Sequence, residues 1–285
     1  MKQIIKDNEL DKQLLAEGYI VVPFLNTDEI QQLKKTYYDK HPTVLNGMYA
    51  TAHVPDLDLR MQMNSTIKQV FTRAINNIFI NENALGGSYI AKGKNQAGTL
   101  TPHQDWNIVD EEKFRSFNIW VPLVDLHENN GAICIMPKSH LWQQTYRSAN
   151  IPSVYREVEP ELWQQMARLH MKAGEALIYD HRLIHASGEN KTDEIRLATV
   201  MGVIPNEATM FYYHQKGDKY IEVYESNPEF FLYGNIFEGP KNLKLIGEVE
   251  HALPYVNKQQ FARFVNGKAN GNGVLNWLKN LVGAA

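Results

Sequence analysis

Residues 174–203 read GEALIYDHRLIHASGENKTDEIRLATVMGV, and they contain two apolar strands joined by a polar segment. The runs 176–179 and 196–204 are rich in β-branched and large apolar residues, whereas 187–190 is the turn sequence Ser-Gly-Glu-Asn. Similar short runs recur elsewhere, with few helical stretches between them, at 88–91, 116–124, 132–136 and 209–213. This spacing predicts an antiparallel β-sandwich or barrel rather than a doubly wound sheet.

The N-terminal part of the chain predicts two helices around a short strand. Leucine-spaced apolar residues over 8–17 stop at Gly18, which is a typical helix end. The β-branched run 19–23 follows and ends in proline, as a short strand does. A second helix is predicted over 27–38, with acidic residues in its first turn. An apolar stripe predicts a further helix over 65–77.

The chain of 285 residues is long enough for one large domain or two small ones, so its length alone does not decide the domain count. We expect a single domain over 1–285. Its expected regions are an N-terminal region of helices and strand (8–87), a β core (88–215), a C-terminal helical cover (216–266) and a flexible tail (267–285) with a short apolar segment.

Charge and composition exclude several classes of protein. The 29 basic and 32 acidic side chains give a net charge of −3, which is too balanced to suggest a nucleic-acid or membrane-surface partner. No segment approaches the roughly 18 consecutive apolar residues of a membrane span. The single Cys134 excludes an intrachain disulfide and a multi-thiolate metal site. We therefore expect a cytoplasmic enzyme acting on a small molecule, as a monomer or a homodimer.

His103-Gln104-Asp105 is the first signal of chemistry. In an extended strand, residues two apart point to the same side, so this imidazole and this carboxylate can reach one ion. The pair alone is a weak signal, because most such pairs are a structural histidine beside a surface acid. A third ligand from the histidine-containing segment 181–188 would complete two histidines and one carboxylate. That set leaves coordination positions open and suits iron(II) oxygenases.

Arg196 begins an apolar strand eleven residues after His185. An arginine at such a place is either a surface ion-pair partner or part of a pocket, and its position before an apolar strand favours the pocket. A guanidinium near the metal can bind a dicarboxylate through a bidentate, charge-assisted pair.

Four stretches of the chain resemble the phytanoyl-CoA dioxygenase family of iron(II)/2-oxoglutarate oxygenases. They are 18–25 (GYIVVPFL), 102–106 (PHQDW), 130–140 (NGAICIMPKSH) and 174–196, and the similarity covers roughly residues 8–205. Lys138 stands where the family usually has glycine, at a structural turn. The resemblance implies a mainly β fold with flanking helices and a double-stranded β-helix (jelly-roll, cupin-like) core.

The resemblance implies that His103 and Asp105 are paired ligands of Fe(II) and that His185 is the distal ligand. It also implies that 2-oxoglutarate and O2 are cosubstrates, with succinate and CO2 as co-products. In related halogenases a small residue at the carboxylate position frees a site for chloride. A carboxylate at Asp105 therefore predicts hydroxylation of a C–H bond or another C–H oxidation.

The cosubstrate pocket follows from the same resemblance. Arg196 would bind the far carboxylate of 2-oxoglutarate, and Ser187 and Trp120 match positions that line the pocket in relatives. Asn118 shares strand parity with Trp120, so we expect its side chain to join them.

Three residues are predicted substrate contacts: Trp106, Arg115 and Tyr213. The first two lie in the hydrophilic loop 106–117, which follows the first metal ligands and is a candidate lid. Tyr213 belongs to the aromatic cluster 211–214, for which core packing is favoured over a substrate wall.

The remaining histidines leave alternatives open. His181 and His185 are four apart, a zinc-type spacing on a helix, but the strand pattern before them favours a structural role for His181. His140 is expected to be a structural hydrogen-bonding residue. Two other functions remain: a cupin-type zinc or nickel isomerase or lyase that does not use 2-oxoglutarate, and a non-catalytic β-barrel binding module.

Overall fold

The computed structural model describes residues 2–41, 46–142, 145–234, 236–251 and 255–267. The helices are α1 (Asn8–Glu17), α2 (Thr27–Tyr38), α3 (Leu57–Ile78), α4 (Glu159–Gln165), α5 (Pro228–Tyr233) and α6 (Lys258–Val265). The strands are β1 (Tyr19–Pro23), β2 (Met48–Ala50), β3 (Glu82–Lys92), β4 (Leu100–His103), β5 (Phe117–Pro122), β6 (Ile133–Ile135), β7 (Ala167–Arg168), β8 (Glu175–Asp180), β9 (His185–Ser187), β10 (Arg196–Pro205), β11 (Met210–Lys216), β12 (Tyr220–Ser226) and β13 (Lys244–Glu250).

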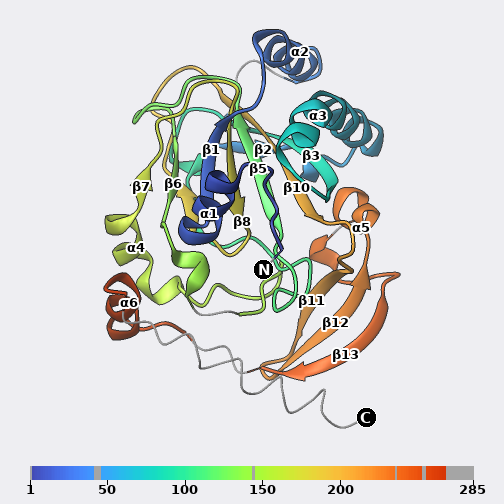
Figure 1. The fold of residues 1–285 in the computed structure, drawn as a ribbon, viewed down its shortest axis with the longest axis vertical. Helices are drawn as coiled ribbons and strands as arrows, with labels where there is room; N and C mark the ends of the chain where they lie inside the picture. Colours follow the sequence, from blue (N-terminus) through green and yellow to red (C-terminus); the bar gives the residue numbers. More distant parts are fainter. Residues whose placement is uncertain (1, 42–45, 143–144, 235, 252–254, 268–285) are drawn as a thin grey trace.

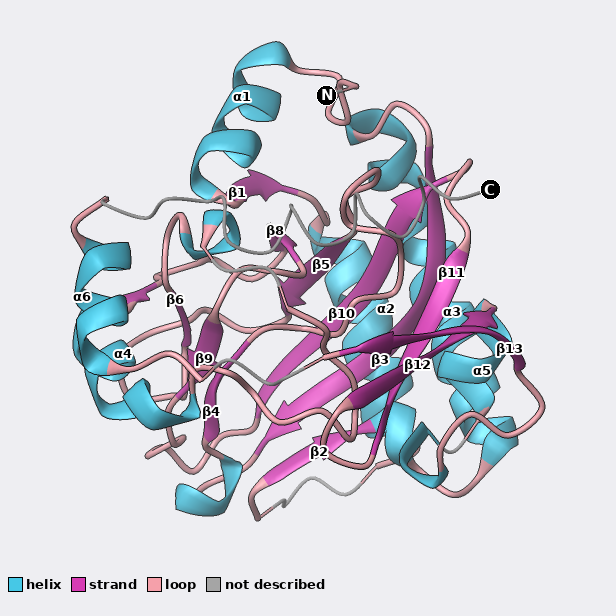
Figure 2. Ribbon diagram, turned by 90° about the horizontal axis from the view of Figure 1, so that it is seen from below, coloured by secondary structure: helices cyan, strands magenta, loops and turns pink. Residues whose placement is uncertain are grey.

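Two antiparallel sheets enclose the centre of the molecule (Figure 1). The larger sheet has the strand order β1-β8-β5-β10-β3-β2, and the smaller one has the order β4-β9-β6-β7. Strands that are distant in sequence are therefore neighbours in space, as in a jelly roll. A third sheet, β11-β12-β13, lies beside them. Figure 2 shows the smaller sheet near α4 and α6, with α3 and α5 at the other end of the molecule.

The larger sheet buries both of its faces, and its sequence alternates accordingly. Ile119 and Val121 of β5 pack into the cluster under the helices, whereas Trp120 between them packs into the cluster between the sheets. Ile133 and Ile135 of the smaller sheet meet Trp120 in that second cluster. The period of two thus divides one strand between two cores.

Helices α1 to α3 cover the outer face of the larger sheet. Their starts are capped by short polar side chains: Asp7 before α1, Asn26 before α2 and Asp56 before α3 each accept backbone N–H bonds. Close packing of α3 requires Gly87 of β3, because a Cβ there would lie 2.6 Å from Cγ2 of Ile67.

Two expectations about local structure need correction. The helix predicted over 65–77 is α3, which begins eight residues earlier, at Leu57. Its first two turns carry exposed Leu57 and Met61, so the apolar stripe that marks a helix starts late. The expected helical cover, 216–266, also contains strands β12 and β13, and β11 pairs with β12 rather than with the two main sheets. Ile221 is the one buried residue of β12, so the alternation that predicts a strand is weak there.

Other observations concern the chain ends and one turn. The apolar segment expected within the tail, 274–282, lies outside the described residues. Lys138 adopts a left-handed conformation with φ of 67°, which accounts for the glycine usual at this turn. Among the helices of the described ranges, none is long and apolar enough to cross a membrane.

Candidate metal and cosubstrate site

The pairing of β4 with β9 brings the two predicted histidine ligands together. His103, the last residue of β4, lies opposite His185, the first residue of β9, and their ring centroids are 4.3 Å apart. Asp105 follows two residues after β4 ends. One ligand atom from each of the three side chains lies within 4.8 Å of the others. The fold therefore places two imidazoles and a carboxylate around one point.

Both imidazole rings are oriented by the backbone. Nδ1 of His103 lies 2.8 Å from the carbonyl oxygen of Thr101, and Nδ1 of His185 lies 3.0 Å from that of Leu183. A carbonyl only accepts, so Nδ1 carries the proton in each ring and Nε2 keeps its lone pair. The two Nε2 atoms are 4.0 and 3.8 Å from Oδ1 of Asp105. Both rings thus present a metal-binding nitrogen to the carboxylate.

Asp105 is held in place by Asn118. The amide Nδ2 of Asn118 donates to Oδ2 of Asp105 at 2.7 Å, which leaves Oδ1 facing the histidines. Burial opposes ionisation, but His185, His181 and His103, together with Asn118, lower the pKa of Asp105 to about 2. Burial also lowers the pKa of His103 to about 4. At neutral pH the site therefore offers the neutral imidazole of His103 and the carboxylate of Asp105, the forms that bind a metal.

The donor set fits iron(II). Two imidazole nitrogens and one carboxylate oxygen lie within 4.8 Å of one another. This is the donor set of the facial triad in non-haem iron(II) oxygenases. The side chains of His103 and Asp105 remain 29% and 25% exposed, whereas that of His185 is 6% exposed. The open side needed by a cosubstrate and oxygen is therefore next to His103 and Asp105.

Arg196 lies buried at the start of β10, and no residue of the described ranges forms an ion pair with it. Its Nε has no hydrogen bond, and no carboxylate of the described residues is within ion-pairing distance of its guanidinium. The guanidinium lies 5.2 Å from the ring centroid of Trp120. Burial lowers the pKa of Arg196 to about 10, so the side chain stays charged at neutral pH. A buried, unpaired guanidinium is unfavourable unless a ligand pairs with it, which fits a dicarboxylate cosubstrate.

Lys92 is a second buried cation, and its role in the site was not predicted from the sequence. It stands opposite Arg196 in the β3–β10 pair and is 0% exposed. Its Nζ donates to Oγ of Ser187 at 2.6 Å and to the carbonyl oxygen of Gly188 at 2.7 Å. Burial and the charge of Arg196 lower the pKa of Lys92 to about 7. The sequence signal for it is a lysine directly after the apolar run 89–91.

The structure therefore brings together the residues predicted for the metal and the cosubstrate. Asn118 and Trp120 lie on β5, and Ser187 lies on β9 two residues after His185. Asn118 also lies 3.4 Å from the hydroxyl of Tyr179, which in turn lies 3.4 Å from Nε2 of His185.

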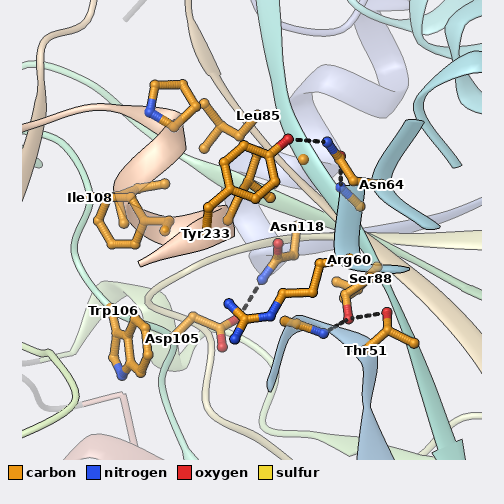
Figure 3. A pocket seen from close by; sticks show the side chains of 18 of the residues that line it. Thr51, Arg60, Asn64, Leu85, Ser88, Asp105, Trp106, Ile108, Asn118 and Tyr233 are labelled. Atoms are coloured by element: carbon orange, nitrogen blue, oxygen red, sulfur yellow. Dashed lines mark hydrogen bonds between the residues drawn. The ribbon is translucent and has the colours of Figure 1, made fainter. Parts of the chain in front are cut away.

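A cavity of about 280 Å³ opens beside Asp105 (Figure 3). Trp106, one of the predicted substrate contacts, lines this cavity. Buried His181 lines it too, and its Nε2 has no hydrogen-bond partner among the described residues. Much of the rest of the wall comes from parts of the chain that the sequence did not indicate. These are residues of α3 (Arg60, Asn64), of β3 (Leu85, Gly86, Gly87, Ser88) and of α5 (Phe231, Leu232, Tyr233).

The other two predicted substrate contacts lie elsewhere. Arg115 is buried in an ion pair with Asp180, 2.8 Å apart, and does not line the cavity beside Asp105. Tyr213 packs against Tyr146, with ring centroids 5.0 Å apart, as the packing interpretation of its aromatic cluster expected. The loop 106–117 is also more fixed than a free lid, because Glu111 pairs with Arg147.

The comparisons with known proteins agree with this geometry. Residues 16–198, more than half of the chain, match the model of the phytanoyl-CoA dioxygenase family. Dioxygenase trt7 of Aspergillus terreus is 32% identical over 119 residues, which are 39% of this chain. The match spans only 37% of that relative's own length.

Solved structures with the same architecture include two enzymes of nogalamycin biosynthesis. The epimerase SnoN, in complex with Fe3+, alpha ketoglutarate and nogalamycin RO, has a TM-score of 0.50 at 19% identity, over 71% of this chain and 84% of that chain. The alpha ketoglutarate-dependent carbocyclase SnoK has a TM-score of 0.53 at 14% identity, over 72% and 86% of the two chains. They confirm the predicted double-stranded β-helix fold. Together with the family match, they show that this chain belongs to the phytanoyl-CoA dioxygenase family of iron(II)- and 2-oxoglutarate-dependent oxygenases.

Proposed function

We propose that this protein is an iron(II)- and 2-oxoglutarate-dependent dioxygenase that hydroxylates an unactivated C–H bond of a small molecule. One observation carries the proposal. The fold that brings together His103, Asp105 and His185 also holds the buried, unpaired guanidinium of Arg196. A metal-dependent isomerase or a binding module without 2-oxoglutarate has no need of an unpaired cation in this place.

The protein side chains position and hold the reacting groups. Iron(II) with 2-oxoglutarate and O2 supplies the oxidising power for C–H cleavage, with succinate and CO2 as co-products. His103 and His185 present Nε2 because the backbone holds Nδ1–H. Asn118 turns Oδ1 of Asp105 towards them. These contacts fix the ligand geometry before the metal binds, which lowers the reorganisation needed on binding.

A second group of side chains would orient the cosubstrate. Arg196, whose guanidinium lies over the ring of Trp120, would bind its far carboxylate. Lys92 holds the hydroxyl and the carbonyl of Ser187, and adds a second positive charge. All four side chains are buried, so water competes little for the carboxylate.

Hydroxylation is the outcome we propose because the third ligand is the carboxylate of Asp105. The fold alone does not fix the outcome, since SnoN is named an epimerase and SnoK a carbocyclase. Both are described as enzymes of nogalamycin biosynthesis. We therefore propose a natural product or small metabolite as the substrate class of this protein.

The proposal is tested by measuring succinate release from 2-oxoglutarate with Fe(II), O2 and a metabolite library, followed by mass analysis of the products. We expect one library member to stimulate succinate release and to gain one oxygen atom. His103→Ala and Asp105→Ala abolish this release, whereas the exposed His170→Ala does not. Full activity in the first two variants would exclude the site, and a product without added oxygen would exclude hydroxylation.

A further inference from the structure

The cavity beside Asp105 has one strongly basic side chain, Arg60 of α3. On the basis of the proposed function, we propose that the substrate of this enzyme carries a carboxylate group and that Arg60 binds it. The apolar remainder of the substrate then extends along the cavity towards Asp105. Arg60 is thus a specificity-determining residue, and the substrate class is a small monocarboxylic acid with an apolar body.

The side chain of Arg60 is aimed into the cavity by its own helix. Arg60 and Asn64 are four residues apart on α3, so they lie on the same helix face, and both line the cavity (Figure 3). The Nε of Arg60 donates to the carbonyl oxygen of Val54, which precedes the helix. This bond anchors the side chain and leaves the two terminal nitrogens available for a ligand.

Arg60 also lacks the partner that most other arginines of this chain have. Arg73 pairs with Glu29, Arg115 with Asp180 and Arg147 with Glu111. Within the described ranges, by contrast, no carboxylate lies within ion-pairing distance of Arg60. Its position is half-buried, where a charge pair is screened less than at the surface. An anionic ligand is the group that best satisfies such a guanidinium.

Among the described residues, Asp105 is the only one that presents a carboxylate to the cavity, and the proposed metal neutralises it. The bound substrate therefore meets a net positive field from Arg60. The two terminal nitrogens of a guanidinium form a planar fork that matches the two oxygens of a carboxylate. The single charge of Arg60 balances that of a carboxylate, whereas a phosphate monoester carries close to two negative charges at neutral pH.

The rest of the cavity defines the remainder of the substrate. Its walls are largely apolar, from Leu85, Trp106, Ile108, Val200, Phe231 and Leu232. One neutral donor is also present: Tyr233 accepts from Nδ2 of Asn64 at 3.2 Å, so its own hydroxyl hydrogen remains available. The volume of about 280 Å³ is at the lower end for ligand pockets, which limits the substrate to a small molecule.

The test measures binding and does not depend on turnover. Protein loaded with Zn(II) and 2-oxoglutarate is titrated, by ligand-observed NMR, with alkanoic and phenylalkanoic acids and with the primary amide of each acid. We expect the wild type to bind at least one acid roughly 10- to 100-fold more tightly than its amide, the range of a charge-assisted hydrogen-bonded pair. Arg60→Gln should lose this preference, and Arg60→Lys should keep part of it.

The matched control is Arg73→Gln, which removes one positive charge from the same helix outside the cavity and should keep the preference. Equal binding of acid and amide by the wild type, or an unchanged preference in Arg60→Gln, would overturn the inference. So would failure of every acid to bind, or tighter binding of an alkyl phosphate. Affinity for 2-oxoglutarate is measured in the same samples. If the wild type does not bind 2-oxoglutarate, the proposed function is rejected. If Arg60→Gln binds 2-oxoglutarate as tightly as the wild type, the substrate site and the cosubstrate site are separate.

Discussion

The proposed cosubstrate end, around Arg196, and the proposed substrate end, the cavity beside Asp105, are built from different parts of the fold. At the cosubstrate end, Arg196 and Lys92 stand opposite each other on adjacent central strands and are 3% and 0% exposed. At the substrate end, Arg60 and Tyr233 come from α3 and α5, outside the main sheets, and both are partly exposed.

This difference assigns a separate task to each end. A sheet ladder fixes Arg196 and Lys92 by many backbone hydrogen bonds, so the cosubstrate end tolerates little change. Helices packed on the sheet surface can vary at their inward residues without disturbing the ladder. We infer that the chemistry is set by the strands and the substrate choice by the helices, and each prediction below tests one side of that division.

The largest expected effect is on the cosubstrate end. Arg196→Gln should weaken 2-oxoglutarate binding on the order of 100-fold or more, because it removes one partner of a buried charge pair. Arg60→Gln should leave the same affinity within about twofold, the scale of a small perturbation. Calorimetric titration of both variants measures this contrast, and equal losses in the two would abolish the division.

The next effect concerns how α5 closes the substrate end. A Cβ at Gly86 of β3 would collide with the side chain of Leu232 on α5. Gly86→Val should therefore destabilise the fold by about 1–3 kcal/mol and weaken binding of carboxylic acids, with 2-oxoglutarate affinity retained. Gly247→Val on β13 is the control, because a Cβ there meets nothing within 4 Å. Thermal unfolding measures the stability of the two variants, and NMR titration measures their affinity for carboxylic acids. An unchanged acid affinity in Gly86→Val would show that α5 does not contribute to the substrate end.

A smaller effect is expected from pH. Burial, followed by the charge of Arg196, lowers the pKa of Lys92 to about 7. The dianionic cosubstrate favours protonated Lys92, so its affinity should be complete below pH 7 and fall as pH rises, by at most about tenfold per unit. Lys92→Met should bind more weakly and flatten this dependence. A wild-type affinity that is constant from neutral to alkaline pH would show that Lys92 does not contribute its charge.

The smallest effect is expected at the surface. Arg73 pairs with Glu29 at 2.7 Å, with the arginine side chain 52% exposed. Arg73→Gln should lower the free energy of unfolding only slightly, because solvent screens exposed pairs. Chemical denaturation measures this change. A much larger loss would mean that α2 and α3 are joined chiefly by this contact.

The metal triad and Arg196 could be proposed from sequence because each belongs to a short strand pattern with family-specific spacing. Lys92 could not, since its importance comes from the cross-strand register with Arg196. The same limit applies to the substrate end, where Asn64 and Tyr233 meet although 169 residues separate them. The ion pair of Arg115 could not be predicted for the same reason, since its partner Asp180 is 65 residues away. Local patterns predict strands and ligands, whereas partners across the fold need the structure.

The most direct test of the central claim is an anaerobic titration of the Fe(II)-loaded protein with 2-oxoglutarate, followed by visible absorption. Chelation of iron(II) by a 2-oxo acid produces a charge-transfer band, so the measurement reports metal and cosubstrate at one site. We predict that the band forms in the wild type, is lost in Asp105→Ala and needs far more 2-oxoglutarate in Arg196→Gln. Absence of the band in the iron-loaded wild type, or an unchanged band in Asp105→Ala, would contradict the account.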